Sequence, residues 1–421
     1  MTSVAIEERI LTIYKISIIL CKECTNTIKY FQLTMSKLQN ISWKIILGYF
    51  FLRPFVSSAT FGYFEFSLNI ILLISALLYF HKKRIPYTLI DKVIGIFYIT
   101  MIITTLVNKN TLIGLHQVHQ LLILMVLFYI GKTLNKQQQK QLFFALILGA
   151  TILFCCSLRY YFIVSQYALE YLSKNNIHYP FAEEFILRKR AFAPFITPSI
   201  LAGYTSIILL LSTGITIQHV RENRKNLSLF FSILCFVLGL TTLFLTRSIG
   251  AYILFVISLA IMLIATKTLP KKIFIVILVL LPLFSVIANV RTINTRRFTN
   301  PSFSFERRLV YWEKTWDIIC QNPIFGVGRN NLSLPEARST HNSYLQIWAE
   351  NGIIGILSWL LIVLLFIKKG LKNARSPAKS YIKAGCFAGG IFFLTHNIIN
   401  FDFFVSQEAF LWWVLLGMNE N

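Results

Sequence analysis

The chain has 421 residues, of which 56% are hydrophobic and only 14% are charged, and its mean hydropathy is +0.64. A soluble protein of this length could not bury so much apolar surface, so we expect lipid to be part of its solvent. The formal net charge of +24 would also suit a nucleic-acid-binding protein, but the cations lie where a membrane protein places them. The seven cysteines show no paired framework, and we expect no structural disulfides.

Residues 1–42 are expected to form an N-terminal segment at the cytoplasmic surface of the membrane. Lysines recur there every seven or eight residues among Ile, Leu and Tyr, at Lys15, Lys22, Lys29 and Lys37. This spacing predicts an amphipathic helix that lies on an anionic leaflet. The apolar run within the segment is too short to span a bilayer.

Apolar runs long enough to cross roughly 30 Å of hydrocarbon recur along the rest of the chain. We count twelve, at approximately 43–60, 63–80, 89–107, 112–130, 141–163, 194–217, 227–246, 248–266, 272–290, 352–367, 381–400 and 402–418. The sequence therefore predicts an all-α polytopic membrane protein with about twelve transmembrane helices. Nine of these fall within residues 43–290 and three within 352–421, and they leave one large helical loop at 291–351.

The connectors between these runs alternate in charge. One set holds eighteen Lys and Arg residues, whereas the alternate short connectors hold two, Lys109 and Arg247. By the positive-inside rule, the basic connectors and both termini lie in the cytoplasm. The two longer connectors, 164–193 and 291–351, then lie on the outer side. The cations are thus explained as topology signals, without nucleic acid.

The outer loop 291–351 is long, polar and aromatic, which is unusual in this chain. Its pattern predicts a helix from Phe305 to Cys320. Arg308, Trp312 and Trp316 are spaced by four residues and therefore share one face of that helix.

Helix-breaking residues separate this helix from a second one. Asn322-Pro323 is expected to end the first helix, and Gly326-Val327-Gly328 is expected to form a turn. The glycines do not predict a nucleotide-binding loop, because no strand precedes them and no Lys-Ser/Thr follows. Ser339 or Thr340 can cap a second helix that ends at Asn351-Gly352.

His341 is expected to lie in the first turn of this second helix. The helix dipole there disfavours the imidazolium and leaves a neutral imidazole that can act as a base near pH 7. Tyr344 and Trp348 follow after three and seven residues and should share its face.

Chemically useful residues from separate parts of the chain are expected to meet at the outer face: Arg190, Arg247, Arg308, His341, His396 and Asp402. Several arginines can neutralise a diphosphate without a metal, because each guanidinium binds phosphate as a planar fork. A histidine can accept the proton of an attacking sugar hydroxyl. Aromatic rings suit the apolar faces of sugars or a lipid chain. Together they favour glycosyl transfer from a lipid diphosphate, with no metal and no cofactor.

The principal candidates also have structural interpretations. Arg247 could anchor a span at the membrane interface. Arg308 could form an ion pair with Glu306 or Glu313. His341 could be a satisfied histidine at a helix terminus.

The remaining polar candidates are open to the same alternatives. Arg190 lies in a basic run, so it could belong to a solvated patch. His396 and Asp402 lie near the outer end of the eleventh apolar run, where a structural role is as reasonable as a functional one. Arg53 and Glu65 fall in adjacent spans, where burial of a charge is costly, and they could pair with each other.

Four ordered motifs resemble those of the O-antigen ligase and polymerase superfamily of bacterial inner membranes. They are Thr246-Arg247-Ser248-Ile249-Gly250-Ala251, Arg308-Leu309-Val310-Tyr311-Trp312, Asn322-Pro323-Ile324-Phe325-Gly326-Val327-Gly328, and His341-Asn342-Ser343-Tyr344-Leu345 followed by Glu350-Asn351-Gly352-Ile353-Ile354-Gly355. The resemblance covers roughly residues 240–360. Elsewhere it extends only to hydropathy and span count.

The resemblance implies a metal-independent glycosyltransferase that acts on the periplasmic side, with an undecaprenyl-diphosphate-linked glycan as donor. In the ligases the acceptor is a sugar hydroxyl of lipid A-core, in the polymerases it is another lipid-linked repeat, and some relatives transfer glycans to protein. The family's essential arginines and histidine match the residues that we expect to be catalytic, namely Arg247, Arg308 and His341. The expected substrate-binding residues are Arg190, which resembles a further family arginine, and Trp312, Tyr344 and His396.

We therefore expect an O-antigen ligase in the bacterial inner membrane, whose partners are the lipid-linked glycan, lipid A-core and membrane lipids. The motifs do not separate ligase from polymerase, but the length, span count and single modest outer loop favour the ligase. A polymerase is the first alternative, and a protein O-glycan transferase or a lipid-linked sugar transporter are further ones. A transporter should carry polar residues along the midplane of several spans, and these spans are largely apolar.

Overall fold

The computed structural model describes residues 35–56, 62–108, 111–177, 180–266, 303–332, 334, 339–374 and 380–421. Within these residues the chain is helical, and no β-strand is present. The expected all-α fold is therefore confirmed for this part of the chain. Most of the predicted N-terminal segment lies outside the described residues, and its last part begins a helix over 35–52.

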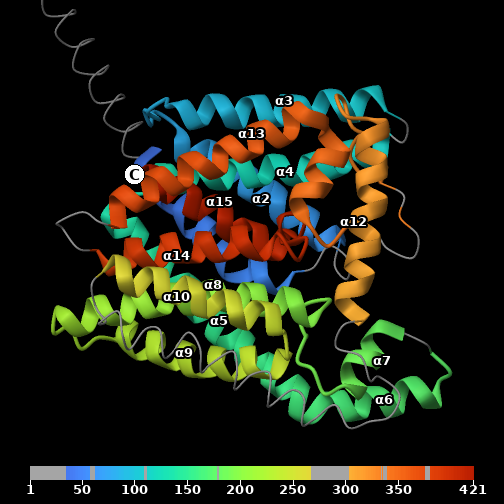
Figure 1. The fold of residues 1–421 in the computed structure, drawn as a ribbon. Helices are drawn as coiled ribbons and strands as arrows, with labels where there is room; N and C mark the ends of the chain where they lie inside the picture. Colours follow the sequence, from blue (N-terminus) through green and yellow to red (C-terminus); the bar gives the residue numbers. More distant parts are fainter. Residues whose placement is uncertain are drawn as a thin grey trace, which may run out of the picture.

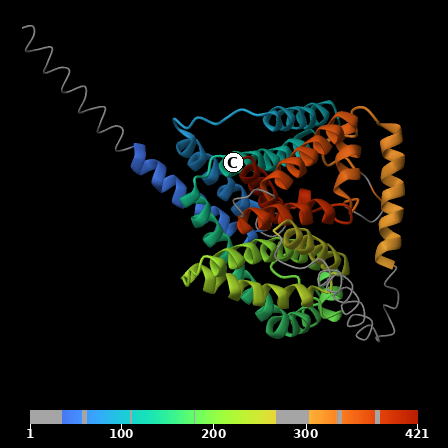
Figure 2. The same ribbon diagram turned by 60° about the vertical axis from the view of Figure 1, so that its left-hand side comes forward.

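The elements follow one another in the order of the apolar runs. The first half contains the helix 35–52, the 3₁₀ helix η1 (Arg53–Phe55), α2 (Gly62–Phe80), α3 (Leu89–Val107), α4 (Thr111–Lys132), α5 (Lys136–Arg159), the π-helix η2 (Tyr160–Val164), α6 (Ser165–Lys174) and α7 (Pro180–Leu187). The second half contains α8 (Pro198–Arg221), α9 (Leu227–Thr246), α10 (Ile249–Ala265), α12 (Phe303–Gln321), α13 (Ser343–Ala374), α14 (Tyr381–His396), the 3₁₀ helix η3 (Asp402–Phe404) and α15 (Ser406–Glu420). Most of the long helices run side by side, and α12 lies across one end of the bundle (Figures 1 and 2).

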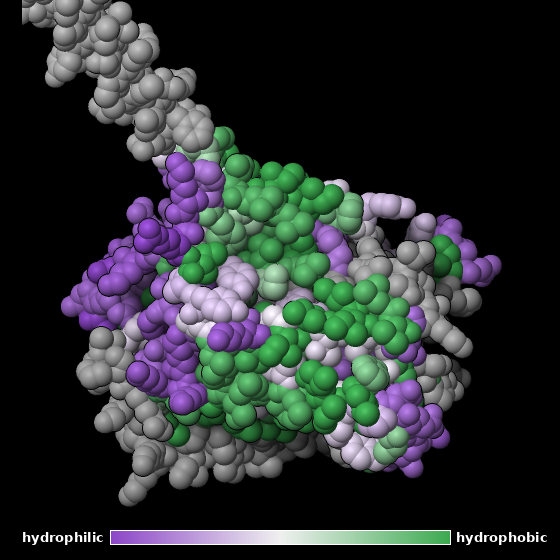
Figure 3. Space-filling model, turned by 90° about the horizontal axis from the view of Figure 1, so that it is seen from above, coloured by the Kyte–Doolittle hydropathy of each residue, from purple (hydrophilic) through white to green (hydrophobic). Residues whose placement is uncertain are grey.

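Six described helical segments are long and apolar enough to cross a membrane: Gly62–Phe80, Leu89–Val107, Lys136–Lys174, Pro198–Arg221, Leu227–Thr246 and Ser343–Ala374. Two shorter apolar stretches are Leu122–Lys132 and Ile249–Ala265. On the face shown in Figure 3, a broad hydrophobic surface lies between hydrophilic ends. The chain is thus a multi-pass membrane protein. The count of twelve stays a prediction, because the run 272–290 lies outside the described residues.

The helix expected to end at residue 163 continues instead. The π-helical turn Tyr160–Val164 joins α5 to α6, so the helical segment runs from Lys136 to Lys174. The predicted outer loop 164–193 therefore begins as helix, and α7 follows within it.

Helix α8 lies at the centre of the bundle, and 83% of its most apolar stretch is buried. It packs against α9 and α14, while α15 packs against α4. Glycines allow the closest approaches. A Cβ on Gly214 would lie 2.5 Å from the carbonyl oxygen of Tyr381, and a Cβ on Gly417 would lie 2.0 Å from that of Phe128. Helices that meet in a membrane commonly use small residues in this way.

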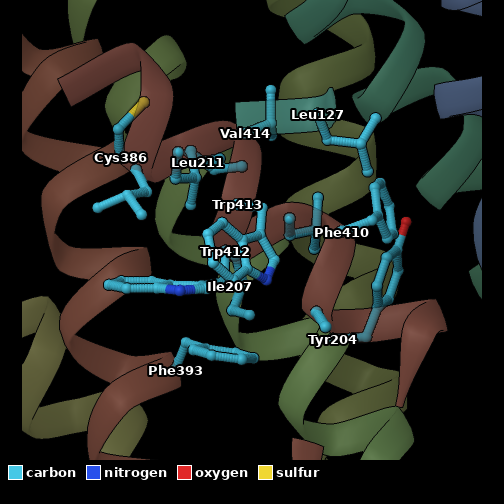
Figure 4. Packing of buried hydrophobic residues seen from close by; sticks show 14 of the residues in the cluster. Leu127, Tyr204, Ile207, Leu211, Cys386, Phe393, Phe410, Trp412, Trp413 and Val414 are labelled. Carbon is cyan, nitrogen blue, oxygen red and sulfur yellow. The ribbon is translucent and has the colours of Figure 1, made fainter. Parts of the chain in front are cut away.

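Aromatic side chains fill the space between α8, α14 and α15, as Figure 4 shows. Trp412 and Trp413 are fully buried, and Phe393 stacks on Trp412 with a centroid distance of 5.4 Å. Large rings packed on both sides leave α15 little freedom. The turn between α14 and α15, which carries Asp402, is fixed at both of its ends.

Two ion pairs join helix ends that carry basic residues. Lys132 forms an ion pair with Asp91, which lies in the first turn of α3. Lys369 near the end of α13 pairs with Glu420 at 3.0 Å. One ion pair therefore joins the end of α4 to the start of α3, and the other joins α13 to the end of α15. That the basic connectors are cytoplasmic stays a prediction of the charge pattern.

The start of α15 is held by a buried ion pair. Arg53 and Glu65 pair as the sequence suggested, and their side chains are only 1% and 3% exposed. Ser406 Oγ donates to Glu65 Oε1 at 2.7 Å, and Gln407 Nε2 donates to the carbonyl of Pro54 at 2.9 Å. This network joins η1 and α2 to the beginning of α15.

Candidate functional site

The turn after α12 interlocks with a break in α13. Val327 N–H donates to the carbonyl of Ala349 at 2.8 Å, and Gly328 N–H donates to that of Glu350 at 2.9 Å. Gly352 has φ +65°, and a Cβ there would lie 1.9 Å from the carbonyl oxygen of Ile324. The predicted turn and the predicted helix end are both confirmed. These two motifs position the loop on α13.

Arg329, which the sequence analysis did not select, is a buried part of this interlock. It is 6% exposed and forms an ion pair with Glu350, which also accepts a hydrogen bond from Gln346 Nε2 at 3.0 Å. Its guanidinium lies 4.1 Å from the ring centroid of Phe404. An arginine directly after the glycine turn, with a glutamate before Gly352, was the signal that could have revealed this pair.

His341 lies before α13, which corrects the prediction that it belongs to the first turn. The helix begins at Ser343, and the cap is Asn342, whose Oδ1 accepts from the N–H groups of Tyr344 and Leu345 at 3.0 and 3.1 Å. The backbone of His341 is left-handed, with φ +52°. A non-glycine residue in this conformation occurs mostly where the surrounding structure fixes it.

The imidazole of His341 is held between aromatic rings. The ring centroids of Tyr311 and Phe401 lie 6.1 and 5.2 Å away, and among the described residues its Nδ1 has no hydrogen-bond partner. Burial, and then the nearby Arg308 guanidinium, lower the pKa of His341 to about 4. The imidazole is therefore neutral at pH 7, as expected, but burial rather than the helix dipole is the main cause.

Arg308 reaches from α12 towards the turn between α14 and α15. Burial lowers the pKa of its half-buried guanidinium, whereas the Asp402 carboxylate raises that pKa. Asp402 also raises the pKa of His341. Among the described residues, no ion pair joins Arg308 to Glu306 or Glu313. The structure thus brings Arg308, His341 and Asp402 into one neighbourhood.

His396 is fully enclosed rather than open to a substrate. Its Nδ1 pairs with Asp402 Oδ2, and Asn400 Nδ2 donates to Asp402 Oδ1. The backbone N–H of Ser343 donates to the carbonyl of Asn397 at 2.9 Å, which ties this turn to the start of α13. His396 therefore acts on the site through Asp402.

The two aromatic candidates differ in what they contact. The hydroxyl of Tyr344 donates to the carbonyl of Leu394 at 3.0 Å, so it joins α13 to α14. Trp312 is half-buried one turn after Arg308 on α12. Trp316, one turn further, packs edge-on against Trp348 at 5.5 Å. The expected face of α12 is thus present, whereas Tyr344 has a structural hydrogen bond.

Arg190 and Arg247 form a pair of cations at the junction of α9 and α10. Arg247 ends α9 with φ +51°, and its Nη1 donates to the carbonyl of Arg188 at 3.1 Å. Arg190 Nε donates to the carbonyl of Thr246 at 2.8 Å. Burial, followed by the neighbouring arginines Arg188 and Arg247, lowers the pKa of Arg190 to about 10. With this pKa the Arg190 guanidinium is charged at neutral pH, so an anion beside it would be stabilised by charge-assisted hydrogen bonds.

One contact connects this arginine pair to the histidine neighbourhood. A Cβ on Gly250, three residues after Arg247, would lie 2.5 Å from Cδ1 of Ile399. Ile399 is followed by Asn400 and Phe401, which contact Asp402 and His341 respectively. The start of α10 and the turn after α14 therefore lie against each other.

A metal could be considered only at one place in the described residues. One ligand atom from each of His396, Asp402 and Glu408 lies within 4.8 Å of the others, and all three residues are buried. The oxygens of Asp402 already accept from His396 and Asn400, however. The catalytic candidates lie outside this group.

Comparison with known proteins identifies the segment that carries these residues. Residues 234–360 match the family model described as O-antigen ligase. This segment is an O-antigen ligase family domain. It includes Arg247, Arg308 and His341, and it agrees with the resemblance expected over roughly 240–360. The chain is also 22% identical over 404 residues to an uncharacterized protein of Haemophilus influenzae, across 87% of this chain and 92% of that protein.

The O-antigen ligase family domain does not contain every element of the site. Arg190 precedes it, and His396, Asp402 and Glu408 follow it. Arg190, one member of the arginine pair, and Asp402 are therefore supplied by parts of the chain outside the matched segment. Packing of α8, α14 and α15 brings those parts to the domain.

Proposed function

We propose that this protein is an inner-membrane glycosyltransferase that moves a glycan from undecaprenyl diphosphate to a sugar hydroxyl of lipid A-core at the periplasmic face. The observation that carries the proposal is the juxtaposition of a neutral His341 imidazole, whose Nδ1 has no hydrogen-bond partner among the described residues, with the Arg308 guanidinium, inside an O-antigen ligase family domain. A base beside a fixed cation suits attack on a sugar with an anionic leaving group.

In this mechanism the arginines bind and stabilise the diphosphate. The bond between the anomeric carbon and the diphosphate oxygen breaks as the acceptor oxygen attacks from the opposite face, with inversion. The charge left on the diphosphate is shared by Arg308, Arg247 and Arg190, which are fixed in place before the reaction. Trp312 would line the glycan or lipid chain beside Arg308.

His341 receives the proton that the acceptor hydroxyl loses. In the free protein its pKa of about 4 makes it a weak base. A diphosphate bound to Arg308 brings negative charge beside the ring and offsets the effect of that guanidinium, so donor binding raises the pKa of His341. The base is thereby activated mainly when a donor is in place.

The decisive experiment is the replacement His341→Ala in a null strain, with lipopolysaccharide resolved on a gel. We expect bare core without the polymer ladder, at normal expression of the variant. A wild-type ladder would remove His341 from the mechanism. Transfer by the purified protein from a synthetic lipid-diphosphate donor, without ATP or an ion gradient, would distinguish an enzyme from a transporter.

The second candidate is an O-antigen polymerase that joins lipid-linked repeat units. It would use the same arginines and histidine, because both reactions displace a lipid diphosphate with a sugar hydroxyl. The null strain separates the two functions. Loss of a ligase leaves bare core and polymer on the lipid carrier, whereas loss of a polymerase leaves core that carries one repeat unit.

A further inference from the structure

A second acid lies directly beside Asp402. Glu408, in the first turns of α15, is fully buried, and the group that it forms with His396 and Asp402 is the one within 4.8 Å described above. The carboxyl of Glu408 rests on α8 at Gly203, where a Cβ would lie 2.0 Å from Oε1. The glycine therefore creates the space that the acid occupies. The proposed reaction does not use Glu408.

The hydrogen bonds of the two acids are unequal. Asp402 receives donors on both oxygens, from His396 Nδ1 and Asn400 Nδ2. Within the described chain, neither oxygen of Glu408 accepts from an N–H or hydroxyl group, and the polar side chain in hydrogen-bonding reach is Asp402 itself. A buried carboxylate without donors is strongly unfavourable, and it normally takes up a proton instead.

Two carboxylates this close in the interior cannot both be ionised, so one proton must be shared between them. The donors decide where the charge stays. Asp402 is stabilised as an anion by two hydrogen bonds and by the attraction of Arg308, whereas Glu408 has no such support. The proton therefore resides on Glu408.

We propose that Glu408 is a protonated acid that donates a hydrogen bond to Asp402, and that this bond fixes Asp402 as the counter-ion of Arg308 and of the imidazolium that His341 becomes when it accepts the acceptor's proton. Asp402 is the carboxylate whose charge acts on both groups, so a change in its position would change the electrostatic environment of Arg308 and His341 together. Glu408 is thus a positioning residue. The positioning role rests on the proposed function of Arg308, but the protonation state does not.

Infrared spectroscopy tests the protonation state without any assay of activity. We would record the difference spectrum between the wild-type full-length protein and Glu408→Gln, both purified in lipid nanodiscs at neutral pH. The expected result is a carbonyl band of a protonated carboxyl group that is lost in the variant and shifts in D₂O. Loss of carboxylate bands alone would overturn the proposal. So would a stoichiometric bound metal that disappears in Glu408→Gln.

Two replacements of similar volume test the positioning role. Glutamine can donate to Asp402 as the protonated acid does, whereas methionine fills the same space without a donor. We expect Glu408→Gln to retain glycan transfer within about threefold and Glu408→Met to lower kcat/KM about 10–100-fold, the usual effect of losing a group that orients a site residue. Both should melt close to wild type. Equal activity of the two variants, or loss in both, would exclude the donated hydrogen bond.

These results are separable from the proposed function. If the wild-type protein transfers no glycan from a lipid diphosphate, the proposed function fails while the infrared band can still be present. If the wild-type protein is active and the band is absent, the carboxyl pair is wrong and the transferase is unaffected.

Discussion

Arg190 donates its Nε–H to the carbonyl oxygen of Thr246 at 2.8 Å, and Thr246 is the residue directly before Arg247. One arginine therefore supports the backbone from which the other projects. The arrangement also places two cations side by side at the end of α9, where burial, and then the charges of Arg188 and Arg247, lower the pKa of Arg190 and disfavour its charge. Such a pair is costly without an anion, which is why a diphosphate is a suitable ligand.

Replacement of Arg190 by lysine should separate its charge from its hydrogen bond. Lysine keeps the cation but has no Nε–H in the position that contacts Thr246, so Arg247 loses its support. A hydrogen bond to a charged group contributes about 1.5–3 kcal/mol, which corresponds to roughly a 10–100-fold loss in kcat/KM. Steady-state transfer kinetics with a lipid-diphosphate donor would measure it.

The matched control for this variant is Lys189→Gln, because Lys189 is an exposed neighbour in the same basic run. We expect it to change kcat/KM less than threefold, as a surface charge would. Equal losses in both variants would show that the run acts as a general basic patch, which was the structural alternative.

The pH dependence of catalysis should report the buried imidazole. Because the pKa of His341 is lowered to about 4, the ring is neutral and competent as a base above that pH and is protonated below it. The acidic limb of kcat/KM, which reports the free enzyme, should therefore lie near pH 4 rather than near the ordinary histidine value of about 6.5. Arg308→Gln removes a cation beside the ring and so raises the pKa of His341. The acidic limb of the residual activity of this variant should therefore move to higher pH.

A histidine at the opposite end of α8 provides the control. His219 is half-buried, and its Nδ1 lies 2.9 Å from the carbonyl oxygen of Ile215. His219→Gln should leave the acidic limb where it is. A limb near pH 6.5 in the wild-type protein would contradict a buried, cation-facing His341.

The parts of this site that could be predicted were those with a local signal. Apolar runs identified the helices, and breaker residues identified the end of α12 and the turn at Gly326-Val327-Gly328. The helix cap was mistaken because Ser339, Thr340 and Asn342 are all good capping residues within four positions. The choice among them depends on contacts made by Ser343 with the distant Asn397, which no local pattern contains.

Contacts between distant segments were beyond the sequence pattern for the same reason. Asp402 acts on Arg308 only because the fold brings α12 and the turn after α14, which are far apart in the sequence, into one neighbourhood. Glu408 lies within an apolar run and was not selected from the sequence. The space that its carboxyl group occupies depends on Gly203, more than two hundred residues earlier. The pairing of Arg53 with Glu65 was accessible, since two opposite charges in adjacent spans have few other partners.

The interlock between α12 and α13 predicts a severe effect at Gly352. Alanine there would place Cβ 1.9 Å from the carbonyl oxygen of Ile324 in a backbone with φ +65°, so both sterics and conformation oppose it. We expect Gly352→Ala to lower the free energy of unfolding by about 1–3 kcal/mol. The melting temperature in detergent and the yield of folded protein should both fall as a result.

Gly95→Ala is the matched control for this change. A Cβ on Gly95, in α3, meets no atom within 4 Å. Because alanine is favoured over glycine in a helix by up to about 1 kcal/mol, this variant should melt at or above the wild-type temperature. Similar melting temperatures for the two variants would show that the loop is not held on α13 as described.

The ion pair between Arg53 and Glu65 predicts a strongly non-additive stability. Removal of one partner leaves a buried charge, so Arg53→Met or Glu65→Gln alone should each cost about 3–5 kcal/mol. The double replacement removes both charges and should recover most of that loss, because a buried pair and an apolar substitute are often nearly equal in stability. Denaturant unfolding in detergent, read as a double-mutant cycle, would measure the coupling.

Ser406→Ala belongs in the same series, because Ser406 Oγ donates to Glu65 at 2.7 Å. Loss of this hydrogen bond should lower the free energy of unfolding far less than loss of either charge. Additive losses for Arg53 and Glu65 would mean that water, rather than the partner, compensates each charge at this end of the bundle.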